Sequence, residues 1–195
     1  MESHCIEKNS LRVDKEETCV SINIKCKEPR NVSKGMKTEF NITLTKRITC
    51  VVGDSGTGKT QLCNILSILL GGLNSTRPRE QYICKEYETF GEIIKITEND
   101  KCMAMGEVAI INIDNNYMLI GKFEDNVKHR RLVIIDNAMD IIDEDIAKII
   151  AEDKNTNYLI MGRSDLCDYL ENDNYAELVR NGAEVRLVYT GKGRR

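Results

Sequence analysis

The chain has 195 residues, of which 41% are hydrophobic and 30% charged, a balance typical of one globular domain. Lys and Arg number 28 against 31 Asp and Glu, and this near-neutral balance argues against general polyanion binding. With 5% aromatic residues and no Trp, the chain lacks the stacking platform of a single-stranded nucleic-acid binder. We predict one domain covering residues 1–195.

Eight cysteines are scattered along the chain without a CxxC pair, and there are only two histidines, so a zinc site is disfavoured. Some lie in apolar runs, as Cys50 does, which is typical of small buried side chains in a reducing compartment. The amino terminus lacks a signal-peptide pattern, and the apolar runs fall far short of the ~20 residues of a membrane span. We expect a cytoplasmic protein with reduced cysteines and no membrane span.

Two segments near the amino terminus alternate apolar and polar side chains, Val20–Cys26 and Phe40–Thr45. This period of two is typical of half-buried strands, and the residues between them have a loop composition. We therefore predict an N-terminal antiparallel hairpin over residues 18–46.

A second, smaller hairpin is predicted within residues 79–105. Its strands are Tyr82–Cys84 and Ile93–Ile96, on either side of Gly91. It interrupts the pattern of the following chain, so we interpret it as a β insert.

The rest of the chain alternates short apolar runs with helical patterns, beginning with a helix near Lys59. Strands that alternate with helices predict an α/β fold with a mostly parallel sheet covered on both faces. The last strand, Val185–Tyr189, has Glu184 and Arg186 interleaved, as expected of an exposed edge. The five predicted core strands are residues 48–52, 108–113, 132–135, 158–161 and 185–189.

Residues 53–60 match the pattern G-x-x-x-x-G-K-[ST] between an apolar strand and an amphipathic helix. The glycines allow the backbone N–H groups to wrap around a phosphate, and the helix presents its positive end. Lys59 is expected to reach the β- and γ-phosphates and Thr60 to coordinate Mg²⁺. The predicted nucleotide-binding residues are Gly53, Asp54, Ser55, Gly56, Thr57, Gly58, Lys59, Thr60 and Gln61.

On this motif the chain resembles the P-loop NTPases over residues 18–190. The apolar run Leu132–Ile135 followed by Asp136 is similar to their Walker B segment, which implies that Thr60 and Asp136 hold the metal. The resemblance also implies one further strand between the phosphate-loop strand and the Asp136 strand. That is the arrangement of the ATPase division with AAA, transporter-type and recombinase-type members, a three-layer αβα fold with a five-stranded core.

The lead-in Phe40–Gly53 is similar to that of transporter-type ATPase domains. However, Leu70–Leu73 ends the first helix and is not a transporter signature, and no such signature lies before Asp136. A true transporter ATPase is therefore disfavoured, and no closer family is assigned.

The catalytic base departs from the family pattern, because Asn137 stands where a Glu usually orients the attacking water. Two substitutes are Asp114, which ends the preceding strand as in recombinase-type ATPases, and Asp140, one turn beyond Asp136. We favour Asp114. A site that binds ATP and hydrolyses it slowly remains open.

Arg163 follows the strand 158–161, where related ATPases carry a polar sensor. Its predicted roles are contact with the γ-phosphate of its own site or of a neighbouring subunit, or a helix cap or pairing with Asp165. The basic runs 128–131 and 192–195 are interpreted as solvated surface rather than nucleic-acid contacts.

We therefore predict a Mg²⁺-dependent ATP-binding protein, an ATPase that acts as a motor, switch or regulatory subunit. ATP is favoured over GTP, because Asp136 lacks a Gly three residues later and no Asn-Lys-x-Asp sequence exists. The alternatives are a nucleotide or small-molecule kinase, although Arg79 is the only arginine in the insert, and an ATP-binding interaction module. Since the fold uses nearly the whole chain, a protein partner or a homo-oligomer is expected; nucleic acid is allowed but not indicated.

Overall fold

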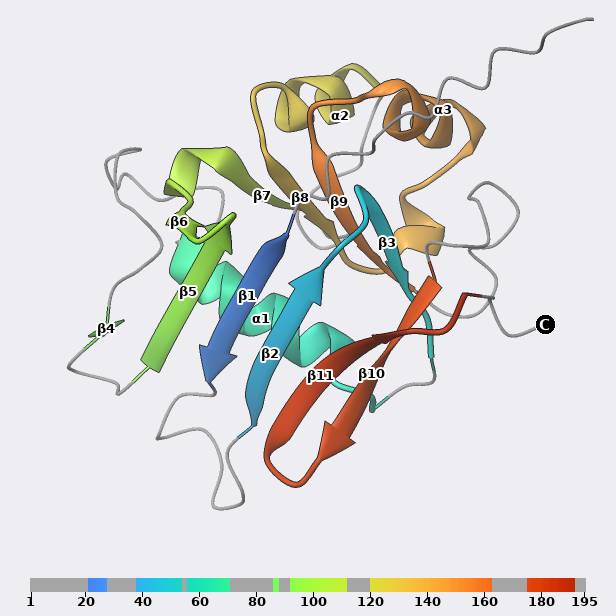
Figure 1. Ribbon diagram of the computed structural model, residues 1–195. Coiled ribbons are helices and arrows are strands. Elements are labelled where there is room, and N and C mark those ends of the chain that lie inside the picture. The colour runs from blue at the N-terminus through green and yellow to red at the C-terminus, as the bar shows by residue number, and fades with distance from the viewer. Residues whose placement is uncertain are drawn as a thin grey trace, which may run out of the picture.

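A mixed, curled β-sheet with a few helices packed on it makes up the described part of the chain (Figure 1). This agrees with the predicted α/β class. The computed structural model describes residues 21–27, 38–53, 56–70, 86–87, 92–111, 120–162 and 175–191.

These residues contain eleven strands and three α-helices. The strands are β1 (Ile22–Lys27), β2 (Glu39–Leu44), β3 (Ile48–Val51), β4 (Glu86–Tyr87), β5 (Glu92–Glu98), β6 (Lys101–Cys102), β7 (Val108–Ile111), β8 (Leu132–Ile135), β9 (Asn157–Met161), β10 (Tyr175–Asn181) and β11 (Glu184–Tyr189). The helices are α1 (Lys59–Leu70), α2 (Ile120–Val127) and α3 (Glu144–Glu152), and short 3-10 turns cover Met105–Glu107 and Ala138–Asp140. The strand order is β4-β5-β1-β2-β11-β10-β3-β9-β8-β7, with β6 paired to β5.

Five neighbouring strands, β10-β3-β9-β8-β7, pair in parallel throughout. Within this run β9 lies between β3, which leads to the glycine-rich motif, and β8, which is followed by Asp136. The extra strand expected between these two is therefore present. The whole sheet is larger and less parallel than predicted, because the remaining strands join it mainly through antiparallel pairs.

The carboxyl-terminal strand β11 corrects one prediction, because it lies inside the sheet between β2 and β10 and is not an edge. Val185 is fully buried whereas Arg186 is exposed, so the alternation marks a half-buried face. The fifth strand of the parallel run is β10, which pairs with the end of β3 at Tyr175 and Cys50.

The predicted insert belongs to the same sheet as the N-terminal hairpin. β1 pairs antiparallel with β2 on one side and with β5 on the other, so the chain from Glu92 extends the hairpin. β4 and β6 both pair with β5. The predicted strand Tyr82–Cys84 lies outside the described residues.

Buried side chains form two apolar clusters on the two faces of the parallel run. In β7, Val108 and Ile110 join the first cluster, while Ala109 and Ile111 join the second. This split follows from the strand geometry, because alternate residues of a strand point to opposite faces of the sheet. Helices cover both faces of the parallel run. Helix α1 supplies Leu62, Cys63, Ile65 and Leu66 to the first cluster, and α2 and α3 supply Phe123, Val127, Ile146, Ala147 and Ile150 to the second.

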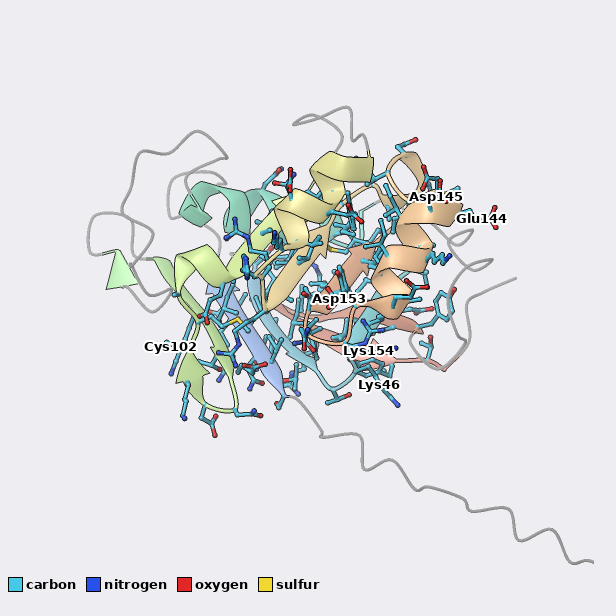
Figure 2. The ribbon with its side chains drawn as sticks, turned by 90° about the horizontal axis from the view of Figure 1, so that it is seen from above. Lys46, Cys102, Glu144, Asp145, Asp153 and Lys154 are labelled. Atoms are coloured by element: carbon cyan, nitrogen blue, oxygen red, sulfur yellow. The ribbon has the colours of Figure 1, made fainter. Side chains whose placement is uncertain are left out.

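Helix α3 shows how local sequence fixes an element. The Asp143 side chain accepts a hydrogen bond of 2.9 Å from the Ile146 N–H, and Glu144 and Asp145 occupy the first turn (Figure 2). At the other end, the Arg47 guanidinium donates to the carbonyl oxygens of Ile150, Ala151 and Asp153. A cation at a helix carboxyl end is favourable, so Arg47 fixes α3 against the start of β3.

The cysteines depart from expectation at one position. Cys26, Cys50 and Cys63 are free and buried, as predicted for reduced core side chains. Cys102 of β6 is disulfide-bonded, so the prediction is wrong there. Cys102 is half-buried in the β5–β6 hairpin and not in the core, so the argument for a buried, reduced side chain does not apply to it. Separately, no helix in the described ranges is both long enough and apolar enough to cross a bilayer.

Candidate functional site

The glycine-rich segment, residues 53–60, connects the end of a parallel strand to the start of a helix. It is called the phosphate segment below, after the sequence pattern that it matches. Gly53 lies two residues beyond β3, and α1 begins at Lys59. The helical hydrogen-bond ladder begins where the Leu62 N–H donates to the Gly58 carbonyl oxygen at 2.9 Å. The N–H groups ahead of Leu62 thus stand at the positive end of α1, where anions bind. Asp54 and Ser55 lie outside the described residues.

All three glycines of this segment have a backbone that residues with a Cβ rarely adopt. The φ values are 142° at Gly53, 93° at Gly56 and 100° at Gly58. At Gly58 a Cβ would also lie 3.4 Å from the Phe40 ring, whereas at Gly56 the space is open. Because 3.4 Å is an ordinary van der Waals distance, the requirement for glycine at both positions is conformational.

Lys59 folds back over the segment that precedes it. Its ammonium donates hydrogen bonds of 2.6 Å to the Gly53 carbonyl oxygen and 3.0 Å to the Thr57 hydroxyl. These bonds join the two ends of the segment and hold the lysine charge next to the start of α1. Two sources of positive potential therefore coincide at one place.

Asp136 lies at the same end of the sheet. Its N–H donates to the Ile111 carbonyl oxygen at 2.9 Å, and its side chain is only 5% exposed. Burial raises the pKa of the Cys63 thiol well above its usual value, and the charge of the nearby Asp136 carboxylate raises it further. Because Cys63 follows Thr60 by one helical turn, Asp136 lies near the first turns of α1.

The residue after Asp136 has an unusual backbone. Asn137 adopts the left-handed region at φ 52° and ψ 47°, which Asn tolerates better than most residues, and donates its N–H to Asp136 Oδ1 at 3.1 Å. Asp140 ends the following 3-10 turn and is exposed. The other predicted catalytic residues, Asp114 and Arg163, lie outside the described residues, so their roles remain predictions.

Two residues near the phosphate segment carry no motif and were missed by sequence reasoning. The Thr38 hydroxyl oxygen accepts hydrogen bonds from Gln61 Nε2 at 3.4 Å and from the Arg180 guanidinium at 3.3 Å. Thr38 is 2% exposed and precedes β2, and Arg180 lies near the end of β10. Neither residue lies in a motif of the sequence, so no local signal could have found them.

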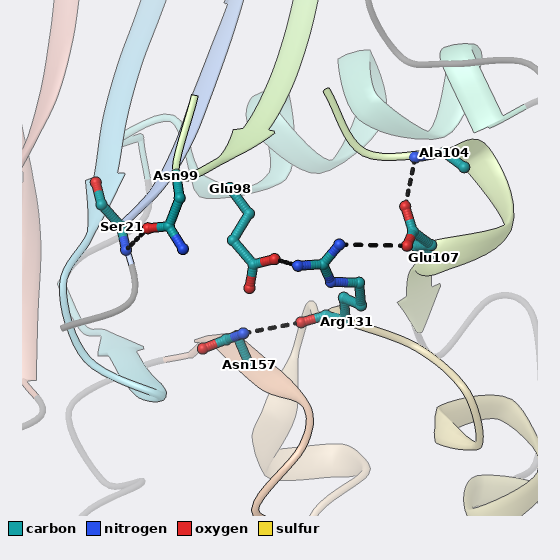
Figure 3. Close-up of polar contacts among 7 residues, drawn as sticks. All are labelled: Ser21, Glu98, Asn99, Ala104, Glu107, Arg131 and Asn157. Atoms are coloured by element: carbon teal, nitrogen blue, oxygen red, sulfur yellow. Dashed lines mark hydrogen bonds and ion pairs between the residues drawn. The ribbon is translucent and has the colours of Figure 1, made fainter. Parts of the chain in front are cut away.

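A second polar cluster lies at the opposite end of β8 (Figure 3). Arg131 forms ion pairs with the buried Glu98 and with Glu107, the latter at 3.4 Å, and its carbonyl oxygen accepts 3.0 Å from Asn157 Nδ2. Arg130 donates to the Gly106 carbonyl oxygen. The basic run 128–131 is therefore partly structural, since only Lys128 and His129 fit the predicted solvated surface.

The described residues contain no group of three or more His, Cys, Asp or Glu side chains arranged to hold a metal ion.

Comparison with known proteins gives only a weak structural similarity. No protein-family model matches the chain, and no curated protein shows a significant sequence match. Among solved structures, the chain is similar to a bacterial Atm1-family ABC exporter with ATP bound, at a TM-score of 0.47 and 9% identity. The match covers 85% of this chain and 38% of the exporter chain, so the chain spans well under half of that protein's length.

Proposed function

We propose that the chain is a P-loop domain that binds Mg²⁺-ATP and hydrolyses it to ADP and phosphate. The observation that carries the proposal is the segment between β3 and α1. Its glycines adopt positive φ values, its lysine lies over the start of the helix, and it matches the complete phosphate-loop pattern. A helix amino terminus and a lysine together suit the β- and γ-phosphates of a nucleotide.

The architecture supports the same proposal. A parallel run with β9 between β3 and β8, and with helices on both faces, is the arrangement expected of a three-layer P-loop ATPase. In such a sheet, ligands bind beyond the carboxyl ends of the strands, which is where Gly53 and Asp136 lie.

Thr60 and Asp136 are the proposed Mg²⁺ ligands. Mg²⁺ is commonly bound through one or two protein oxygens together with substrate phosphates and water, so a hydroxyl and one carboxylate fit its chemistry. The influence of Asp136 on Cys63 supports the closeness of this carboxylate to the helix that carries Thr60. A bound Mg²⁺ would offset the negative charge of the phosphates.

Hydrolysis is assigned to Asp114 as base, with Arg163 contacting the γ-phosphate. Asn137 favours the second candidate, an ATP-binding interaction module with little hydrolysis, because an amide cannot accept the proton of a water molecule. A kinase is the remaining alternative. In each case we propose that the domain acts in the cytoplasm as a motor, switch or regulatory subunit on a protein partner or on further copies of itself.

The test measures phosphate release from ATP and from GTP, with and without Mg²⁺. Wild type is compared with Lys59→Ala and Asp114→Asn, and Asp140→Asn serves as the matched carboxylate control. We expect Mg²⁺-dependent release from ATP that Lys59→Ala and Asp114→Asn abolish and Asp140→Asn retains. Nucleotide binding without release would favour the interaction module, and a new phosphorylated product would favour the kinase.

A further inference from the structure

Thr38 joins three elements beside the phosphate segment. Its buried hydroxyl accepts hydrogen bonds from Gln61 of α1 and from Arg180 of β10, at 3.4 Å and 3.3 Å. Thr38 itself precedes β2, whose Glu39 N–H donates 2.8 Å to the Ala183 carbonyl oxygen in the β10–β11 turn. One side chain thus ties the phosphate-binding helix to the far end of a strand that sequence reasoning did not connect with the site.

Arg180 lies next to the anion-binding end of α1. Gln61 precedes Leu62, the first donor of the helical ladder, so its N–H belongs to the helix end that meets an anion. Phe40, which packs against Gly58, is directly opposite Val185, and Val185 is directly opposite Arg180. Arg180 therefore shares the α1-facing side of the sheet with Phe40.

The charge of Arg180 has no acidic partner among the described side chains, and the other arginine of the hairpin differs in this respect. Arg186 pairs with Glu184 at 2.8 Å on the opposite face of the β10–β11 hairpin. The exposed guanidinium of Arg180 adds positive charge on the side of the sheet where α1 begins. Positive charge at a helix amino terminus is stabilised by a bound anion.

We propose that Arg180 is a nucleotide-binding residue that donates to a phosphate oxygen of a nucleoside di- or triphosphate held by the phosphate segment. Thr38 is the positioning residue that sets the guanidinium beside Gln61. The inference rests on the proposed function and adds a second cation, from β10, to its nucleotide site. Arginine suits this role, because its planar fork of donors matches phosphate oxygens.

The first test titrates Mg²⁺-ATP and Mg²⁺-ADP into wild type, Arg180→Met, Arg180→Lys and Arg186→Met. Arg180→Met weakens binding of both nucleotides about tenfold, as expected for one charge-assisted hydrogen bond, and Arg180→Lys restores part of it. The loss shrinks as salt rises from about 0.1 M to 1 M, because salt screens an exposed charge contact. Arg186→Met, on the opposite face of the same hairpin, binds as wild type does.

Two outcomes separate this inference from the proposed function. If Lys59→Ala blocks binding but Arg180→Met matches wild type, the function stands and the role of Arg180 is wrong. If wild type binds no nucleotide, the proposed function fails and this inference fails with it.

The positioning role of Thr38 is tested by Thr38→Val and Thr38→Ser, with melting temperatures recorded alongside affinities. Thr38→Val weakens nucleotide binding, whereas Thr38→Ser, which keeps the hydroxyl, restores it. If Thr38→Ser restores nucleotide affinity although it lacks the methyl group, the hydroxyl positions Arg180 and the packing of Thr38 is not the cause. Unchanged affinity in Thr38→Val, or equal loss in both variants, would overturn this role.

Discussion

The carboxylate of Asp136 lies close enough to the thiol of Cys63 for its charge to raise the pKa of that thiol. One of these residues follows β8 and the other lies on α1, so the pair joins the acid at the strand end to the helix that begins at Lys59. We predict that Asp136→Asn weakens the Mg²⁺-dependent part of ATP binding about tenfold or more, because it removes the proposed metal ligand. ATP titrations with and without Mg²⁺ measure this, and Asp140→Asn is the control. Full Mg²⁺ dependence in Asp136→Asn would contradict the metal assignment.

Gly56 and Gly58 should respond alike to alanine. Both substitutions strain a positive-φ backbone, by about 1–2 kcal/mol, and the Cβ of Gly58→Ala meets the Phe40 ring only at the ordinary contact distance of 3.4 Å. Each variant should therefore lower the free energy of unfolding by about that amount, as urea denaturation would measure. A double-mutant cycle of Gly58→Ala with Phe40→Leu should show little coupling. A much larger loss at Gly58, relieved by Phe40→Leu, would contradict a purely conformational cause.

The Arg131 ion pair should matter more for stability than the exposed pair on β11. Arg131→Met leaves the 8% exposed Glu98 without its cation, which costs about 3 kcal/mol. Arg186→Met breaks a pair in which the arginine is 64% exposed, so water already solvates both charges and the loss should be much smaller. Urea unfolding compares the two, and Glu98→Gln in the Arg131→Met background should recover part of the loss. Similar costs for both single variants would contradict the difference in burial.

The free energy of unfolding should fall in alkaline solution because the Cys26 thiol is buried. Burial raises the pKa of the Cys26 thiol from 9.0 to about 12. The unfolded chain therefore loses this proton before the folded one, so stability is intact below pH 9.0 and declines as pH rises toward about 12. One such group contributes a slope of at most about 1.4 kcal/mol per pH unit. Cys26→Ala should flatten the decline by that share in unfolding experiments across this range, and parallel profiles would contradict it.

Local patterns of the sequence predicted the α/β class and several of the strands and helices around the candidate site. The phosphate segment is contiguous, so its pattern and the strand and helix beside it could be recognised without tertiary information. The run Leu132–Ile135 and the face of α3 were equally clear, because apolar period and helix cap agree. These elements define the surroundings of Lys59 and Asp136.

Long-range pairing accounts for most of what could not be predicted. Whether β11 lies at an edge depends on its pairing with β2, and alternation alone reports only that one face is buried. Thr38 and Arg180 are 142 positions apart and meet through the register of several strands. No local signal distinguishes these two residues from ordinary strand residues.

ATP binding by Lys59 variants tests the central claim most directly. Isothermal titration of Mg²⁺-ATP would compare wild type, Lys59→Ala and Lys46→Ala, where Lys46 is a control lysine in the turn before β3 (Figure 2). Because the Lys59 ammonium lies at the phosphate segment, we predict one bound nucleotide in wild type and Lys46→Ala, and affinity at least about a hundredfold weaker in Lys59→Ala. Equal binding by Lys59→Ala and wild type, or no binding by wild type, would contradict the account.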